Sequence, residues 1–132
     1  MTNVKMLHTK ALQARENAYA PYSGFKVGAA VLTQKGNIYV GANVENVSYP
    51  CGTCAEEAAI GAMIAAGEYE ISDIVIVSGG KELIVPCGAC LQRIFEFSND
   101  NTNIHLADLT GIQKSGNIKE LLPMAFHEDF TK

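Results

Sequence analysis

The residues whose types and spacing best fit a chemical role lie in two short segments. One segment is Cys54-Ala55-Glu56, and the other contains Cys87 and Cys90 with two residues between them. A catalytic zinc ion has three protein ligands and leaves its fourth position for water, and thiolate sulfur is a preferred ligand. Cys54, Cys87 and Cys90 are therefore candidate ligands of Zn²⁺. Glu56 lies close enough to Cys54 to reach the water without binding the metal.

Glu56 is the candidate proton carrier of such a site. Zinc lowers the pKa of its water ligand and makes hydroxide available near neutral pH. A sheltered carboxylate beside that water can act first as a base and then as an acid. Three thiolates leave the zinc centre with a net negative charge, so we expect a positive group nearby to offset it.

Three other interpretations of the cysteines stay open at this point. The segments Cys51-Gly52-Thr53-Cys54 and Cys87-Gly88-Ala89-Cys90 have the spacing of a closed zinc site with four cysteines. Such a site would make the chain a structural zinc module that binds a partner. The thiols can instead be buried apolar side chains, as free cysteines often are. A redox CxxC pair is least favoured, because no thioredoxin-like setting surrounds it.

Composition narrows the class of protein and its partners. A length of 132 residues fits a single domain over residues 1–132. The net charge is −4 and no segment is rich in lysine and arginine, which argues against nucleic acid as a partner. No apolar run approaches the roughly 20 residues of a membrane span. Residues 1–5 lack the apolar segment of a signal peptide, so we expect a cytoplasmic protein whose thiols stay reduced.

The elements that must position these residues follow from hydrophobic periodicity and from turn residues. Expected helices span residues 5–18, 54–66 and 88–97, and expected strands span 26–33, 38–42, 71–78 and 103–107. Residues 43–53 form an expected loop, 111–116 an expected turn, and 118–122 a short helical or extended piece. The first two strands form a hairpin, and the helix between the last two predicts a right-handed parallel crossover. The sequence therefore predicts an α/β fold with one mixed sheet and helices on its faces.

Five segments resemble those of the small, homotetrameric type in the cytidine/deoxycytidylate deaminase family, and the likeness covers nearly the whole chain. They are APYSGFKVGAA (20–30), GANVEN (41–46), CAE (54–56) with Tyr49 five residues before its cysteine, PCGAC (86–90) and ELLPMAF (120–126). The ligand-x-Glu segment followed by Pro-Cys-x-x-Cys is the signature of zinc deaminases. CxxC alone would not be specific, but the five segments together are.

The resemblance implies an activity, a cofactor and an assembly. The activity is hydrolytic deamination of cytidine and 2′-deoxycytidine to the uridine products, a reaction of pyrimidine salvage. Hydroxide at Zn²⁺ would attack the amine-bearing ring carbon while Glu56 shuttles protons. The implied fold has three layers, α/β/α, with a mixed sheet of about five strands. The implied assembly is a homotetramer in which Phe126 and Tyr49 reach a neighbouring subunit's site, and Cys51 is not a ligand.

The resemblance also implies how a free pyrimidine nucleoside would be bound. Asn43 and Glu45 would hydrogen-bond the sugar hydroxyls. Phe25 would pack against the pyrimidine ring, and the backbone at Ala55 would help to hold the base.

Two positions depart from the family's pattern. The family usually has arginine directly after the catalytic glutamate and after the last cysteine, where this chain has Glu57 and Leu91. Arg93, three residues after Cys90, would partly replace the missing charge. Blasticidin-S deaminases share the scaffold and also vary after the Cys-Ala-Glu segment. A modified aminopyrimidine nucleoside, such as blasticidin S or a substituted cytidine, is therefore the alternative substrate.

Overall fold

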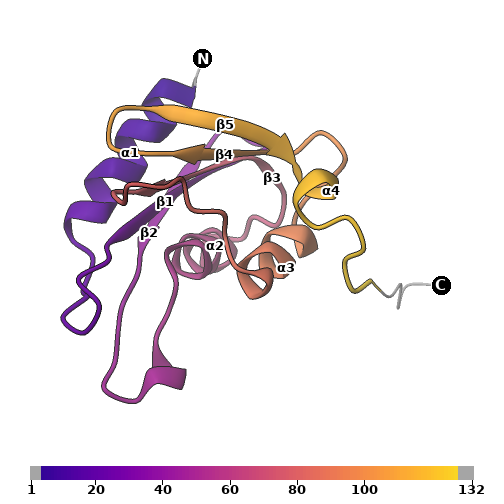
Figure 1. Ribbon diagram of the computed structural model, residues 1–132. Coiled ribbons are helices and arrows are strands. Elements are labelled where there is room, and N and C mark those ends of the chain that lie inside the picture. Colours follow the sequence, from indigo (N-terminus) through magenta and orange to yellow (C-terminus); the bar gives the residue numbers. More distant parts are fainter. Residues whose placement is uncertain (1–3, 128–132) are drawn as a thin grey trace.

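The protein is built around one five-stranded mixed sheet, seen edge-on among its helices in the computed structural model (Figure 1), which describes residues 4–127. The strands are β1 (Val27–Thr33), β2 (Ile38–Ala42), β3 (Ile71–Ser78), β4 (Asn103–Ala107) and β5 (Ile112–Asn117). Their order across the sheet is β2-β1-β3-β4-β5. The β3–β4 pair is parallel and the other neighbouring pairs are antiparallel.

Helices cover both faces of this sheet (Figure 1). The helices are α1 (Val4–Glu16), α2 (Ala55–Ala65), α3 (Gly88–Glu96) and the short α4 (Ile118–Leu121), with a 3-10 turn at Tyr49–Cys51. Leu7 and Ala11 of α1 pack with Val75 and Val77 on one face. On the other face, α2 and α3 pack on the alternate β3 residues, including Ile74. No helix within residues 4–127 is long and apolar enough to cross a membrane.

The predicted three-layer α/β/α fold, the β1–β2 hairpin and the parallel β3-α3-β4 crossover are confirmed. The predicted turn at residues 111–116 is wrong, because Ile112–Asn117 pair with β4 as the edge strand β5. This strand carries exposed polar residues and lacks an apolar alternation, so its pairing comes from its neighbour and not from its own sequence pattern. Residues 118–121 are helical, and Asn117 caps them by accepting a hydrogen bond from the Glu120 N–H.

Helix α2 lies directly on the backbone of β2 at Gly41. A Cβ atom added at Gly41 would lie 2.4 Å from the nitrogen of Ala59 and 2.6 Å from the carbonyl oxygen of Ala55. Only glycine allows the helix to approach the strand this closely. Because Ala55 begins α2, this contact fixes the end of the helix that carries Cys54 and Glu56.

We expect Gly41→Ala to lower the free energy of unfolding by about 3 kcal/mol, because the new methyl group must push α2 away from β2. The control is Gly61→Ala within α2, where an added Cβ meets nothing within 4 Å. That change should raise stability by up to about 1 kcal/mol through helix propensity. Urea unfolding of both variants measures the difference, and equal midpoints would show that α2 is not seated on Gly41.

Candidate metal centre and substrate pocket

The first turns of α2 and α3 bring the predicted chemical groups together. Cys54 is the N-cap residue of α2, Cys87 is the N-cap residue of α3, and Cys90 lies in the first turn of α3. The sulfurs of Cys54 and Cys90 are 2.6 Å apart, and both cysteines are free. These two sulfurs and a carboxylate oxygen of Glu56 all lie within 4.8 Å of one another. Two segments more than thirty residues apart thus form one cluster.

Burial and mutual contact shift the acidity of all three groups. Burial raises the pKa of the Glu56 carboxyl above its usual value. The hydrogen bond from the Cys90 thiol lowers the pKa of Cys54 to about 7, and the same contact raises the pKa of Cys90. A buried carboxyl group with a raised pKa suits acid–base work near neutral pH, and an acidic thiol suits metal binding.

The donor set fits zinc. Soft thiolate donors favour Zn²⁺ over the hard cations that carboxylates alone would select. In a tetrahedral thiolate site with Zn–S bonds of about 2.3 Å, two sulfurs lie about 3.8 Å apart. The Cys54–Cys90 pair is closer than this, so the two thiols must separate to admit the ion. Cys54 and Cys90 would provide two ligands from two different helices.

The third ligand distinguishes the two zinc interpretations. The cluster within residues 4–127 includes neither Cys87 nor Cys51. The Cys87 side chain nevertheless contributes to raising the pKa of the Cys90 thiol, which indicates that it lies near the pair. The exposed Cys51 instead contacts the hydroxyl of Ser48, with 3.6 Å between sulfur and oxygen. These contacts favour Cys87 as the third ligand, which stays a prediction, over a site with all four cysteines.

An open pocket of about 530 Å³ adjoins Cys54. Its lining residues are Tyr22, Ser23, Asn43, Val44, Glu45, Asn46, Tyr49, Gly52, Thr53 and Cys54. Most of them belong to the long loop between β2 and α2, which projects from the sheet at the bottom of Figure 1. Val44 and Thr53 close this loop with two backbone hydrogen bonds of 2.9 Å. That closure places the residues after β2 beside the start of α2.

Glu45 is held in an ionised state by the turn that faces it. Its Oε2 accepts a hydrogen bond of 2.5 Å from the Ser23 hydroxyl. Its Oε1 accepts backbone hydrogen bonds from Tyr22 and Ser23 at 2.9 and 3.1 Å. The Ser23 hydroxyl, the Ser23 amide and the Tyr22 amide together lower the pKa of the Glu45 carboxyl, against a smaller opposing effect of desolvation. The family resemblance implied Glu45 at a sugar site, but no sequence pattern indicated Ser23 as its anchor, because the two residues lie 22 positions apart.

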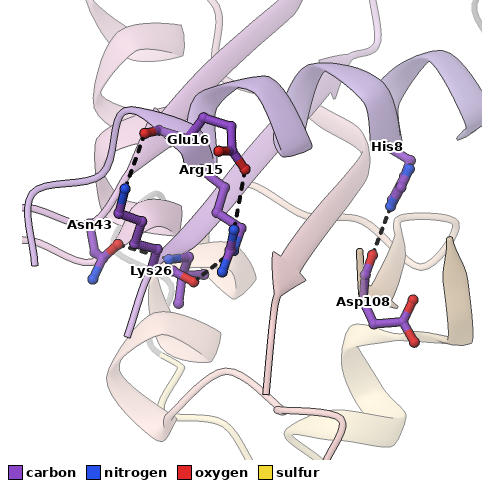
Figure 2. Close-up of polar contacts among 7 residues, drawn as sticks. His8, Arg15, Glu16, Lys26, Asn43 and Asp108 are labelled. Carbon is purple, nitrogen blue, oxygen red and sulfur yellow. Dashed lines mark hydrogen bonds and ion pairs between the residues drawn. The ribbon is translucent and has the colours of Figure 1, made fainter. Parts of the chain in front are cut away.

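Asn43 fastens the same turn to the sheet. Its Nδ2 donates to the carbonyl of Phe25 at 2.8 Å, and its Oδ1 accepts from the amide of Val27 at 2.9 Å. On the other side of the same segment, Arg15 of α1 donates a hydrogen bond of 3.2 Å from Nε to the carbonyl oxygen of Lys26 (Figure 2). The segment that enters β1 is therefore held from both sides, and the Arg15 contact was not predicted from the sequence.

The remaining predicted substrate residues differ in their access to the pocket. Tyr49 lines it, and its ring lies edge-on to that of Tyr22 with 6.3 Å between centroids. Ala55 is fully buried at the first position of α2. Phe25 and Phe126 lie outside the pocket lining of this chain. The Phe126 side chain is 73% exposed, and its carbonyl accepts a hydrogen bond of 2.9 Å from Gln92 of α3.

Comparison with known proteins places the chain among deaminases. Residues 1–106 match the family model described as the cytidine and deoxycytidylate deaminase zinc-binding region. A cytidine deaminase of Halalkalibacterium halodurans is 42% identical over 122 residues, 92% of each chain. One of Sporosarcina psychrophila is 38% identical and covers 96% of this chain and 93% of its own. The crystal structure of a Burkholderia pseudomallei cytidine deaminase superposes with a TM-score of 0.88 at 41% identity, covering 96% of this chain and all of that one.

The anchoring of Glu45 gives a prediction about its titration. Ser23→Ala removes the largest cause of its lowered pKa, so the carboxyl group should titrate at a higher pH. The folded chain favours the ionised form of Glu45, so this carboxylate stabilises the fold at pH values above the ordinary glutamate pKa of about 4.3. That contribution is lost as the pH falls through the lowered pKa of Glu45 in the folded chain. Side-chain carboxyl ¹³C shifts against pH measure this. Ser48→Ala is the control, since Ser48 contacts Cys51, and identical Glu45 titrations in both variants would refute the assignment.

Proposed function

The chain belongs to the cytidine and deoxycytidylate deaminase family, and we propose that it converts cytidine and 2′-deoxycytidine, with water, into the uridine products and ammonia. The observation that supports this most strongly is the buried Glu56 within 4.8 Å of the Cys54 and Cys90 sulfurs. Cys54 of this cluster lines a pocket of about 530 Å³, a volume typical of small-molecule sites, and Glu56 and Cys90 lie behind that lining. The proposed catalytic domain spans residues 1–132.

The proposed mechanism assigns the metal and the proton to different side chains. Cys54, Cys87 and Cys90 would hold Zn²⁺, which when bound activates a water molecule for attack. Glu56 would take one proton from the attacking water molecule and transfer it to the pyrimidine ring nitrogen. The water oxygen would bond to the amine-bearing carbon. Glu56 would then take the second proton from this new hydroxyl group and give it to the amino group, which leaves as ammonia when the carbon–nitrogen bond breaks. Burial of Glu56 keeps these proton transfers apart from bulk water.

The pocket residues would recognise the sugar and the base. Glu45 and Asn43 lie in the lining, and an ionised carboxylate accepts hydrogen bonds from hydroxyl groups. The chain would also accept 2′-deoxycytidine if Glu45 and Asn43 hydrogen-bond mainly to a sugar hydroxyl other than the 2′-hydroxyl. The backbone at Ala55 would hold the base at the helix start, and Phe25 would pack against the ring from the neighbouring turn.

A homotetramer with shared sites would account for several large apolar side chains that this chain exposes. Tyr49 and Val47 on the long loop are 77% and 78% exposed, and Phe126 and Met124 near the C-terminus are 73% and 95% exposed. Large apolar side chains this accessible are typical of surfaces that another chain covers. In the proposed assembly Phe126 and Tyr49 reach the site of a neighbouring subunit. The proposed substrate is a free nucleoside and not a nucleic acid, because the net charge of the chain is −4. The proposed compartment is the reducing cytoplasm, because zinc binding needs reduced thiols.

The function is tested by ammonia release from cytidine. Glu56→Gln in the zinc-loaded protein should lower kcat by about 10²- to 10⁴-fold, because the proton carrier is lost. Glu70→Gln, a change of an exposed glutamate outside this pocket, is the matched control and should leave turnover unchanged. Undiminished release from the Glu56 variant would refute the proposed mechanism. If the native, zinc-loaded protein releases no ammonia from cytidine or 2′-deoxycytidine, the proposed substrates are wrong, and modified aminopyrimidine nucleosides are tested next.

The zinc ligands are tested by a pair of cysteine variants. We expect Cys51→Ser to keep one zinc ion per chain, because its thiol contacts Ser48 and not the cluster. Cys87→Ser should lose most of its zinc affinity, because a ligand is removed. Zinc content after dialysis, measured by mass spectrometry, distinguishes the two variants. Loss of zinc and of the fold in Cys51→Ser would instead establish the structural site with four cysteines.

A further inference from the structure

A histidine on the sheet joins a carboxylate and a hydroxyl group from the two strands beside it. His105 lies on β4 and is almost fully buried. Its Nε2 atom is 2.8 Å from Oδ1 of Asp73 on β3, and its Nδ1 atom is 2.6 Å from Oγ of Ser115 on β5. A histidine that contacts a carboxylate through one nitrogen and a serine hydroxyl through the other is the arrangement that activates a serine nucleophile.

The strand register brings these three side chains to one face of the sheet. His105 pairs directly with Val75 of β3 and with Ser115 of β5. Residues two apart along a strand share a face, so Asp73 lies on the same face as Val75. Val75 packs against α1 on that face, whereas Ile104, next to His105 in the chain, packs on the face that α2 and α3 cover. The sheet therefore separates this cluster from the proposed zinc centre.

The hydrogen bonds of Asp73 determine which nitrogen of His105 carries a hydrogen. The hydrogen bond from His105 and a second one from the Ser72 hydroxyl lower the pKa of the Asp73 carboxyl group, against an opposing effect of burial. An ionised carboxylate only accepts hydrogen bonds, so Nε2 of His105 donates to it. In the neutral ring, Nδ1 then has a free lone pair, and the Ser115 hydroxyl donates to it. The Ser115 oxygen is therefore hydrogen-bonded to a base.

Ser115 and His105 line a cavity of about 560 Å³. One wall comes from the start of α1, which includes Lys5 and His8, and another from the β4–β5 hairpin. His8 fastens the two walls together, because its Nε2 donates a hydrogen bond of 2.9 Å to the carbonyl oxygen of Asp108 (Figure 2). The volume suits a small molecule, and Ser115 is exposed to it. This cavity shares no lining residue with the pocket beside the metal centre.

We propose that Ser115 is a nucleophile for small carboxylic esters, with His105 as its base and Asp73 as the positioning residue that orients the His105 ring. The Ser115 oxygen bonds to the acyl carbon, the ester carbon–oxygen bond breaks, and the Ser115 proton passes through His105 to the departing alcohol. Water then attacks the acyl carbon, its proton passes through His105 to the Ser115 oxygen, and the carboxylic acid leaves. Lys5 supplies a positive charge for the carbonyl oxygen that becomes negative during each attack. This activity is separate from deamination and does not depend on the proposed zinc centre.

A simpler role for the cluster would be to fasten the edge strand β5 to the sheet. A hydrogen bond from Ser115 to His105 would support the pairing of a strand whose own residues are mostly exposed and polar. The two roles differ in the reactivity of the Ser115 hydroxyl. A purely structural serine reacts no faster than another exposed serine, such as Ser48. An activated serine reacts selectively.

The experiment treats the intact chain, in the presence of zinc, with an alkyl fluorophosphonate. This reagent forms a phosphorus–oxygen bond with activated serines and loses fluoride, and mass spectrometry of peptides identifies the labelled residue. We expect a single label at Ser115. His105→Gln and Asp73→Asn should each slow labelling by about 10²-fold, because the base is lost or is held in the wrong tautomer. His8→Gln, which changes another histidine of the same cavity, is the matched control and should leave the labelling rate unchanged.

Hydrolysis of p-nitrophenyl acetate tests the complete reaction. The native chain should release p-nitrophenol faster than Ser115→Ala by about 10²-fold or more. Urea midpoints equal to that of the native chain exclude unfolding as the cause of a slow variant. If a variant does not fold, the position of the label in the native chain still distinguishes the two roles.

Four outcomes would overturn the proposal. They are a native chain that takes no label, a label spread over Ser48 and other exposed serines, unchanged labelling of Ser115 in folded His105→Gln, and equal ester hydrolysis by Ser115→Ala and the native chain. The first two would leave the cluster with the structural role at β5. The third would remove His105 as the base, and the fourth would show that Ser115 does not hydrolyse esters.

Discussion

Two thiols and a carboxyl group, all able to carry negative charge, are packed together at the first turns of α2 and α3. Such groups repel one another when ionised, and a buried site offers little water to relieve the repulsion. Two kinds of positive charge offset this repulsion. They are the partial positive charge at the N-termini of α2 and α3 and the charge of Arg93, which lowers the pKa values of Cys54 and Glu56. A divalent cation bound by thiolates would complete the compensation. The opposite shifts in the pKa values of Cys54 and Cys90 reflect the same conflict.

The scaffold couples this cluster to the pocket through one continuous segment. The chain leaves β2 and forms the loop that lines the pocket. The Val44–Thr53 hydrogen bonds close this loop, and the chain then enters α2 at the proposed ligand Cys54. The seating of α2 on Gly41 fixes the far end of this segment against the sheet. The turn around Ser23 is fixed in turn by Glu45 and Asn43. A substrate in the pocket would thus contact residues whose positions also determine those of the metal ligands.

The sequence predicted what short-range patterns can encode. The apolar run of β3, the apolar helix α2 and the spacing of Cys87 and Cys90 each signalled their structure locally. The edge strand β5 was mistaken for a turn, because its exposed polar residues depend on β4 for their pairing. The contacts of Glu45 with Ser23 and of Glu57 with Arg93 join residues far apart in the chain, so no local pattern specified them. Likewise, the meeting of Cys54 with Cys90 was expected from their chemistry, but its geometry required the packing of two helices.

We expect a zinc ion to bind where α2 and α3 meet, through three cysteines, and to keep one coordination position for water. X-ray absorption at the zinc edge of the loaded, substrate-free protein tests this most directly, since it counts sulfur and light-atom neighbours of the metal. We expect three sulfur atoms at about 2.3 Å and one oxygen at about 2.0–2.2 Å from the zinc ion. Four sulfur atoms and no oxygen would contradict it and would identify a closed structural site.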